Sequence, residues 1–121
     1  MFLSTPKLFV SYTLQDGEID QLFLQNLKDS FCEQCSFDTY IDLLDNTGKD
    51  HQSYVIKNVI ESDFFLLILT SRTLLSRWVN LEITTAKEHL IPIIALPHTS
   101  ILNMQKNHEL NKLPLLAILN Y

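Results

Sequence analysis

Two continuous apolar runs limit the folds that are open to this chain. Phe64–Leu69 reads FFLLIL and Ile91–Leu96 reads IPIIAL, with no polar side chain in either run. Strands that are covered on both faces have this pattern, and they belong to parallel sheets flanked by helices. Pro92 is tolerated because it stands near the start of its run. The sequence therefore predicts an α/β fold around a parallel sheet.

Strand and helix patterns alternate along the rest of the chain. The predicted strands are Lys7–Ser11, Ser36–Asp42, Phe64–Leu69, Ile91–Leu96 and, at the end, Leu115–Leu119. The predicted helices are Ile19–Phe31, His51–Ser62 and Trp78–Leu90, with loops at Leu43–Asp50 and Thr70–Arg77 and an irregular or short helical stretch at Ser100–Lys112. We expect a flavodoxin-like three-layer sandwich with strand order 2-1-3-4-5. Ligands bind such sheets beyond the carboxyl ends of the strands.

Length and charge restrict the organisation and the partners. With 121 residues, the chain is expected to form a single domain over 1–121. The net charge is −5 and the nine basic residues are scattered, so neither nucleic acid nor a membrane is an expected partner. No apolar run approaches the roughly 20 residues of a membrane-spanning helix, and no signal peptide is evident, which favours a cytoplasmic protein.

A last strand at Leu115–Leu119 would leave a bare apolar edge, and we expect self-association or a partner there.

The cysteines and histidines do not predict a metal site. Cys32 and Cys35 form one C-x-x-C pair, which suits a redox pair or half of a zinc site. The pair falls where an apolar helix ends, whereas redox pairs usually begin a helix. The remaining candidate ligands show no paired spacing: His51, His89, His98 and His108. We therefore expect two reduced thiols and no bound metal.

Two flavodoxin-like alternatives lack their defining residues. The chain has two glycines and contains neither G-x-x-x-x-G-K nor G-x-G-x-x-G, so a phosphate-binding loop is not expected. A response-regulator receiver needs an aspartate at the end of its third strand. Here that strand runs into Leu69-Thr70-Ser71, which offers no phosphate acceptor.

An ordered set of short motifs resembles the TIR (Toll/interleukin-1 receptor) domain family. The first strand and turn read Leu8-Phe9-Val10-Ser11-Tyr12, followed by Asp16, and the second strand ends in Tyr40-Ile41-Asp42. The third strand runs into Ser71, and the fourth reads Ile91-Pro92-Ile93-Ile94. The most specific piece is Ser76, then Trp78 two residues on, then Glu82 four further on. The resemblance covers residues 6–97, and the chain is similar to the stand-alone bacterial members of the family. The region after Leu96 departs from the family.

The resemblance implies a site and a reaction. TIR domains that cleave NAD⁺ use a glutamate in the position of Glu82 as the catalytic residue, and NAD⁺ is then a substrate, with no cofactor implied. Tyr12 matches a position that lines the cleft of the family, and Asp42 matches the start of the loop that gates it. Ser71 and Ser76 are candidates to contact substrate hydroxyls, and Trp78 is a candidate wall of the pocket beside Glu82. Helical spacing places Trp78 and Glu82 one turn apart on the same face. The products implied are nicotinamide with ADP-ribose, a cyclic ADP-ribose isomer or a related signal.

Each of these residues also has a purely structural interpretation. Glu82 suits a solvated helix position, Trp78 a core anchor, Tyr12 a packed strand end and Asp42 an ordinary loop. Ser76 suits a cap for the helix that carries Trp78.

The family resemblance also implies partners and leaves other functions open. It implies TIR–TIR self-association and, as in Thoeris-like anti-phage systems, a separate effector protein that responds to the product. One alternative is a non-catalytic TIR–TIR interaction module. Another is a nucleotide N-glycosidase of the deoxyribosyltransferase type, although the glycine-bearing first loop of that type is not evident here.

Overall fold

The computed structural model describes residues 5–35, 37–45 and 51–119 of the chain. Residues 46–50 of the predicted loop and Ser36 of the predicted second strand lie outside these ranges. Four strands form one parallel sheet with the order β2-β1-β3-β4. They are β1 (Lys7–Ser11), β2 (Asp38–Ile41), β3 (Phe64–Leu69) and β4 (Ile93–Pro97). The α/β class, the parallel sheet and the order of the first four strands are as predicted.

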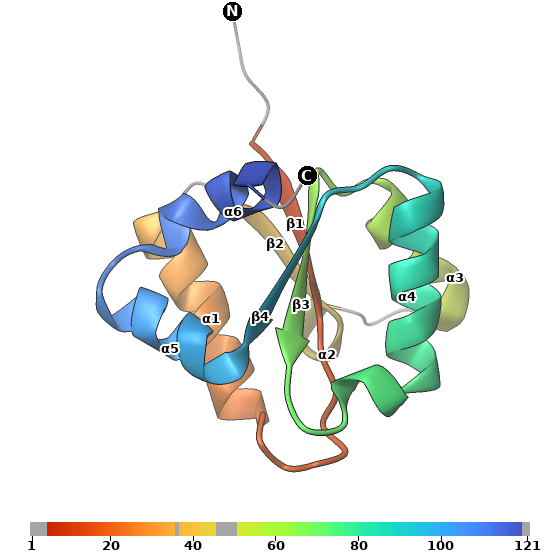
Figure 1. Ribbon diagram of the computed structural model, residues 1–121, viewed down its shortest axis with the longest axis horizontal. Helices are drawn as coiled ribbons and strands as arrows, with labels where there is room; N and C mark the ends of the chain where they lie inside the picture. Colours follow the sequence, from red (N-terminus) through yellow and green to blue (C-terminus); the bar gives the residue numbers. More distant parts are fainter. Residues whose placement is uncertain (1–4, 36, 46–50, 120–121) are drawn as a thin grey trace, which may run out of the picture.

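Helices cover both faces of the sheet (Figure 1). One layer contains α1 (Gln21–Gln34), α5 (His98–Lys106) and α6 (Leu113–Leu119), and the other contains α3 (His51–Ile60) and α4 (Arg77–Glu88). A short helix, α2 (Asp42–Asp45), follows β2, and two 3₁₀ turns, η1 (Thr73–Leu75) and η2 (Leu110–Lys112), lie in the connections.

Alternate residues of the strands supply the two cores. Leu8 and Val10 of β1 pack with residues of α1 and α5, whereas Phe9, between them, faces α3 and α4. On that second face Phe9 stacks between Tyr40 and Phe65, with ring centroids 5.4 and 5.3 Å apart. The buried rows on both faces explain why β3 is apolar throughout.

The predicted fifth strand is wrong. Leu115–Leu119 belongs to helix α6, so the described sheet has four strands rather than five. A short apolar run fits a strand or a helix equally well by pattern alone. Leu and Ala are strong helix formers, and Pro114 lies in the first helical turn, where its missing N–H costs nothing. Asp42–Asp45 is likewise a helical turn, whereas Asp42 was predicted to end the second strand and Leu43–Asp45 to begin a loop.

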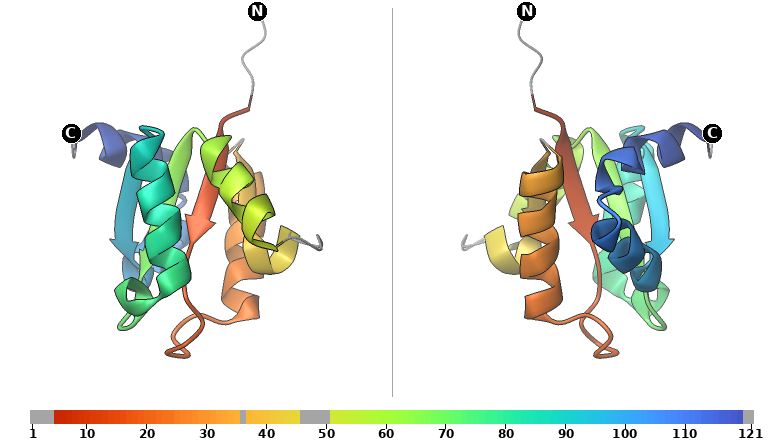
Figure 2. Two further views of the ribbon diagram at one scale, coloured as in Figure 1. Left: turned by 90° about the vertical axis from the view of Figure 1, so that its right-hand side faces the viewer. Right: turned by 90° about the vertical axis from the view of Figure 1, so that its left-hand side faces the viewer.

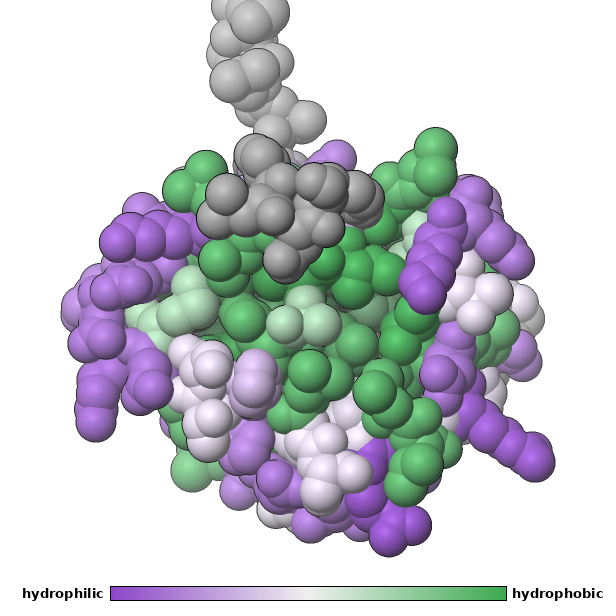
Figure 3. Space-filling model, viewed as in Figure 1, coloured by the Kyte–Doolittle hydropathy of each residue, from purple (hydrophilic) through white to green (hydrophobic). Residues whose placement is uncertain are grey.

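Strand β4, rather than a fifth strand, therefore forms the edge of the described sheet (Figure 2). Apolar side chains gather over this strand between the two helix layers, as the space-filling view in Figure 3 shows. Ala95 and Pro97 of β4 are exposed, and Leu115 of α6 is 56% exposed. Proline is typical of edge strands because it donates no ladder hydrogen bond. Self-association stays a prediction, now for a surface that lies around β4.

Candidate functional site

A cleft of about 270 Å³ lies at the carboxyl ends of β1 and β2, on the side of the sheet that faces α3 and α4. Five of the six residues that the sequence singled out line it: Tyr12, Asp42, Ser76, Trp78 and Glu82. The loop after β1 adds Thr13, Leu14 and Gln15 to the wall, and α3 adds Val55. The carboxyl ends of parallel strands are the ordinary place for a ligand site in such a sheet.

Glu82 is the centre of this cleft. It lies on α4, and its Oε1 accepts a hydrogen bond of 2.8 Å from the hydroxyl of Ser11, the last residue of β1. The pKa of the Glu82 carboxyl is raised from 4.5 to about 7, chiefly by burial; the hydrogen bond from Ser11 opposes this rise, and the charge of Asp42 adds a smaller contribution to it. A carboxyl group with this pKa is present in both protonation states near neutral pH. Perturbed acids of this kind concentrate at functional sites.

Tyr12 and Asp42 line the wall of the cleft opposite Glu82. The Tyr12 hydroxyl accepts a hydrogen bond of 2.9 Å from the backbone N–H of Leu43, so it ties the end of β1 to α2. Burial raises the pKa of Tyr12 to about 12, and Tyr12 therefore stays neutral. Asp42 accepts a bond of 2.8 Å from the hydroxyl of Tyr40. Burial, with that bond to Asp42, raises the pKa of Tyr40.

An ion pair fixes α2 in place. The ammonium group of Lys28, on α1, lies 2.5 Å from Oδ1 of Asp45, and Oδ2 of Asp45 accepts a bond of 2.7 Å from the backbone N–H of Ile41. These contacts join the last residue of α2 to both α1 and β2. Asp42, at the first position of α2, is held at the cleft by the same turn.

Ser76 and Trp78 lie at the start of the helix that carries Glu82. Ser76 is buried and caps α4, since its hydroxyl accepts a hydrogen bond of 3.3 Å from the backbone N–H of Val79. Trp78 is 52% exposed, so it is not the core anchor of the structural interpretation. Its indole and the Glu82 carboxyl line the same cleft from successive turns of α4. An indole beside a carboxylate offers a flat apolar wall and an electron-rich face to a cationic ring.

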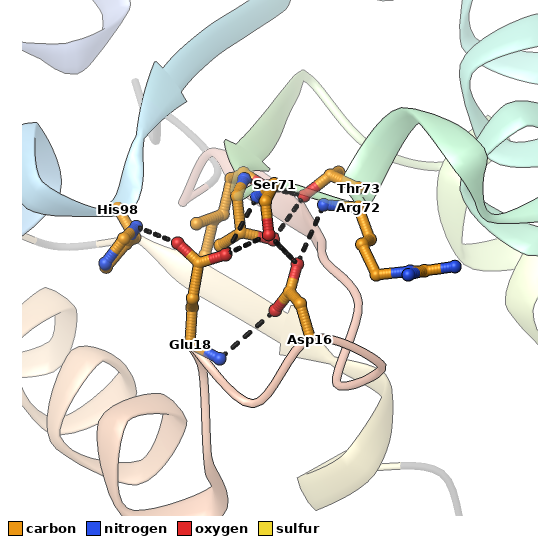
Figure 4. Close-up of polar contacts among 8 residues, drawn as sticks. Asp16, Glu18, Ser71, Arg72, Thr73 and His98 are labelled. Atoms are coloured by element: carbon orange, nitrogen blue, oxygen red, sulfur yellow. Dashed lines mark hydrogen bonds and ion pairs between the residues drawn. The ribbon is translucent and has the colours of Figure 1, made fainter.

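Ser71 is the one predicted site residue that does not line the cleft. Its backbone N–H donates to Oε2 of Glu18 at 2.9 Å, and its hydroxyl bonds to Glu18 and, at 3.5 Å, to Asp16 (Figure 4). Asp16 Oδ2 also accepts from the hydroxyl of Thr70 at 2.5 Å and from the backbone N–H of Arg72 at 2.9 Å. We call this set, Asp16, Glu18, Thr70, Ser71 and Arg72, the acidic clasp.

The acidic clasp joins the loops that follow β1 and β3. Gly17, between the two acids, has a φ of 74° and gives the loop the left-handed turn that lets both carboxylates face the loop after β3. Figure 4 shows His98, at the start of α5, beside Glu18, with His98 Nδ1 4.0 Å from Glu18 Oε1. The loop after β1 also carries Thr13, Leu14 and Gln15, so the clasp fixes one wall of the cleft.

Asp16→Asn is expected to lower the melting temperature at pH 7 more than at pH 3. Hydrogen bonds, above all from Thr70, hold the pKa of Asp16 below its usual 3.8. A carboxyl whose pKa is lower in the folded state stabilises the fold above the unfolded pKa, and this contribution is lost as the pH falls through the folded pKa. Thermal unfolding followed by circular dichroism at both pH values measures the effect. Asp29→Asn on exposed α1 is the control, and an equal loss at both pH values would contradict the role given to the charge.

Three residues of this region had no role predicted from the sequence. Ser11 was quoted only within a motif, and Asp16 only as a match to the family; Glu18 was not singled out. The position of Ser11 was a usable signal, because a hydroxyl at the end of a buried parallel strand lies where the ligand sites of such sheets form.

A larger groove of about 670 Å³ lies between α1 and α5. Neutral side chains such as Asn26, Gln34 and Asn103 line it, together with Lys106 and His108, and none of the described carboxylates does. The groove is therefore larger than the cleft but lacks the carboxyl groups that the cleft offers for catalysis.

Of the described side chains, no three or more His, Cys, Asp or Glu form a group that could hold a metal ion. Cys32 and Cys35 are free thiols.

No protein-family model matches the sequence, and no curated protein matches it. Within the described residues, none of the helices has the length and apolar character needed to cross a bilayer.

Proposed function

We propose that this protein is a TIR-type NAD⁺ glycohydrolase or cyclase of flavodoxin-like topology that cleaves the bond between nicotinamide and ribose. The observation that carries the proposal is the cleft around Glu82, with a partly buried carboxyl of raised pKa, an indole one helical turn away and a second carboxylate on Asp42. The six site residues came from the TIR resemblance, and five of them line one cleft although they are spread over 71 positions of the chain.

The chemistry of the bond suits a site with one well-placed carboxylate. When the C–N bond breaks, its electron pair returns to the pyridinium nitrogen, and nicotinamide leaves as a neutral ring without a proton donor. The ribose is left as an oxocarbenium-like cation, which the Glu82 carboxylate stabilises as carboxylates do in glycoside cleavage. Attack of water at the anomeric carbon, with its proton passing to Glu82, gives ADP-ribose. Attack by a group of the same molecule gives a cyclic isomer.

The two walls of the cleft suit the two parts of that substrate. Trp78 offers a face to the cationic nicotinamide ring, where a cation–π contact contributes about 1–2 kcal/mol. Asp42 and Glu82 offer acceptors to ribose hydroxyls. Ser76 is already the cap of α4, so its hydroxyl serves the helix before it serves a substrate.

The experiment that tests the proposal is product analysis across a substrate panel. Concentrated protein is incubated with NAD⁺, with nicotinamide mononucleotide and with deoxynucleosides, and the released bases are separated by chromatography. The proposal predicts nicotinamide from NAD⁺ and no base from the deoxynucleosides. Base release from the deoxynucleosides alone would favour the N-glycosidase alternative, and no release from any substrate would favour the interaction module.

The biological setting follows from the family resemblance. We include in the proposal that copies of the chain self-associate through TIR–TIR contacts in the cytoplasm. In anti-phage defence, the cleavage reaction then depletes NAD⁺ or its product signals to a separate effector. The apolar surface around β4 supports self-association, because an open strand edge pairs readily. A dilution series that follows both molecular mass and NAD⁺ cleavage tests it, and a monomer at every concentration would contradict it.

A further inference from the structure

Ser11 contacts the candidate catalytic group from an inner strand of the sheet. It ends β1, which lies between β2 and β3, and its side chain is fully buried. Its Cα is in register with that of Leu67 on β3. A hydroxyl on a central strand has little freedom to move, and its bond of 2.8 Å to Glu82 Oε1 spans 71 positions of the chain.

This bond does two things to the carboxyl of Glu82. It engages Oε1, and within the described ranges no protein group bonds to Oε2, which stays available to a ligand in the cleft. It also favours the ionised form, because a hydroxyl that donates to a carboxylate makes a stronger bond than one that donates to a neutral acid. Burial and the charge of Asp42 act in the opposite direction.

The other titratable groups around Glu82 do not replace this effect. Tyr12, beside it in the cleft, stays neutral, and Asp42 is an acid. Tyr54 and Lys57 on α3, the helix packed against α4, and Arg77 on α4 itself are not among the groups that shift the pKa of Glu82. Ser11 is therefore the described group that favours the charged carboxylate.

We propose that Ser11 is a positioning residue, which holds the Glu82 carboxylate in its ionised form with Oε2 directed to the substrate. The inference rests on the proposed function for its consequence in catalysis, but the bond itself can be tested without turnover.

The test is a titration of the Glu82 side-chain carboxyl by carbon-13 NMR in the full chain, in wild type, Ser11→Ala and Ser11→Cys. Loss of one charge-assisted hydrogen bond is expected to move the midpoint up by about one pH unit in Ser11→Ala. Ser11→Cys keeps a weak donor of similar size and should give an intermediate midpoint. Ser62→Ala is the matched control, because Ser62 is also buried but donates to the backbone carbonyl of Asn58.

Catalysis gives the second readout. In Ser11→Ala the kcat for NAD⁺ at pH 7 should fall by about fivefold from the lost ionised fraction, recover in large part at pH 9, and leave KM unchanged. A purely structural role for Ser11 would lower activity equally at both pH values.

The outcomes separate the two proposals. A raised Glu82 midpoint in Ser11→Ala supports the positioning role even where wild type cleaves no NAD⁺, and in that case it is the proposed function that fails. An unchanged midpoint in folded Ser11→Ala overturns the positioning role even where NAD⁺ is cleaved.

Discussion

Glu82→Gln is expected to lower NAD⁺ cleavage by about three orders of magnitude, within the range measured when one electrostatic stabiliser of a transition state is removed. Glutamine keeps the size of the side chain and an oxygen that can accept the bond from Ser11. It cannot carry the negative charge that opposes the cation on ribose, nor take a proton from water. The variant should therefore stay folded and still bind substrate.

Glu88→Gln is the matched control for that result. Glu88 lies on the same helix, is exposed and does not line the cleft. Steady-state rates of nicotinamide release for wild type and both variants measure the effect. Retention of more than about a tenth of the wild-type rate by Glu82→Gln would contradict the catalytic role, because a general base or electrostatic group contributes at least 10²-fold.

The same Glu82→Gln substitution is expected to stabilise the fold at pH 8 by about 2–3 kcal/mol. The Glu82 carboxyl titrates at about 7 in the folded state against 4.5 as its ordinary value. Below pH 4.5 the group is neutral in both states, and the shift costs nothing. Between pH 4.5 and pH 7 the folded state keeps a proton on Glu82 that the unfolded state has lost. The free energy of unfolding therefore falls by up to about 1.4 kcal/mol per pH unit. The full shift corresponds to about 3 kcal/mol, and residual solvent contact reduces it.

Urea unfolding at pH 4 and pH 8 measures this stability difference. The free energies of wild type and Glu82→Gln should be close at pH 4 and separate at pH 8, whereas Glu88→Gln should follow wild type at both. Equal stabilities of wild type and Glu82→Gln at pH 8 would show that the folded protein does not hold Glu82 at a raised pKa. A residue that costs stability and is needed for turnover is typical of active sites.

The sheet was predictable because its signals are local. Phe64–Leu69 has no polar residue to place at a surface, so it had to be a central strand, and the structure contains β3 over the same residues. Leu115–Leu119 carries a similar run but is helical, because its Leu and Ala residues fit a helix and no local pattern distinguishes the two. The short turn of α2 depends on Lys28 and Ile41, which bind Asp45 from other elements.

The cleft was predictable only as a set of motif positions. Strand ends in a parallel sheet converge, so Tyr12 and Asp42 were expected to lie near each other, and helical spacing placed Trp78 beside Glu82. The bond from Ser11 to Glu82 and the bonds from Ser71 to Asp16 and Glu18 join residues more than 50 positions apart. Such pairings depend on how the loops pack against one another. The spacing of apolar residues along the sequence carries no information about that packing. For this reason Ser71 was placed in the cleft, and Ser11 was given no role.

Nicotinamide release from NAD⁺ by concentrated protein, with wild type beside Glu82→Gln, is the most direct test of the proposed reaction. Wild type is expected to release nicotinamide in stoichiometric amounts with ADP-ribose or a cyclic isomer, and the variant is expected to release none above background. Equal release by both proteins would contradict the role of Glu82, and no release by the assembled wild type would contradict the proposed reaction.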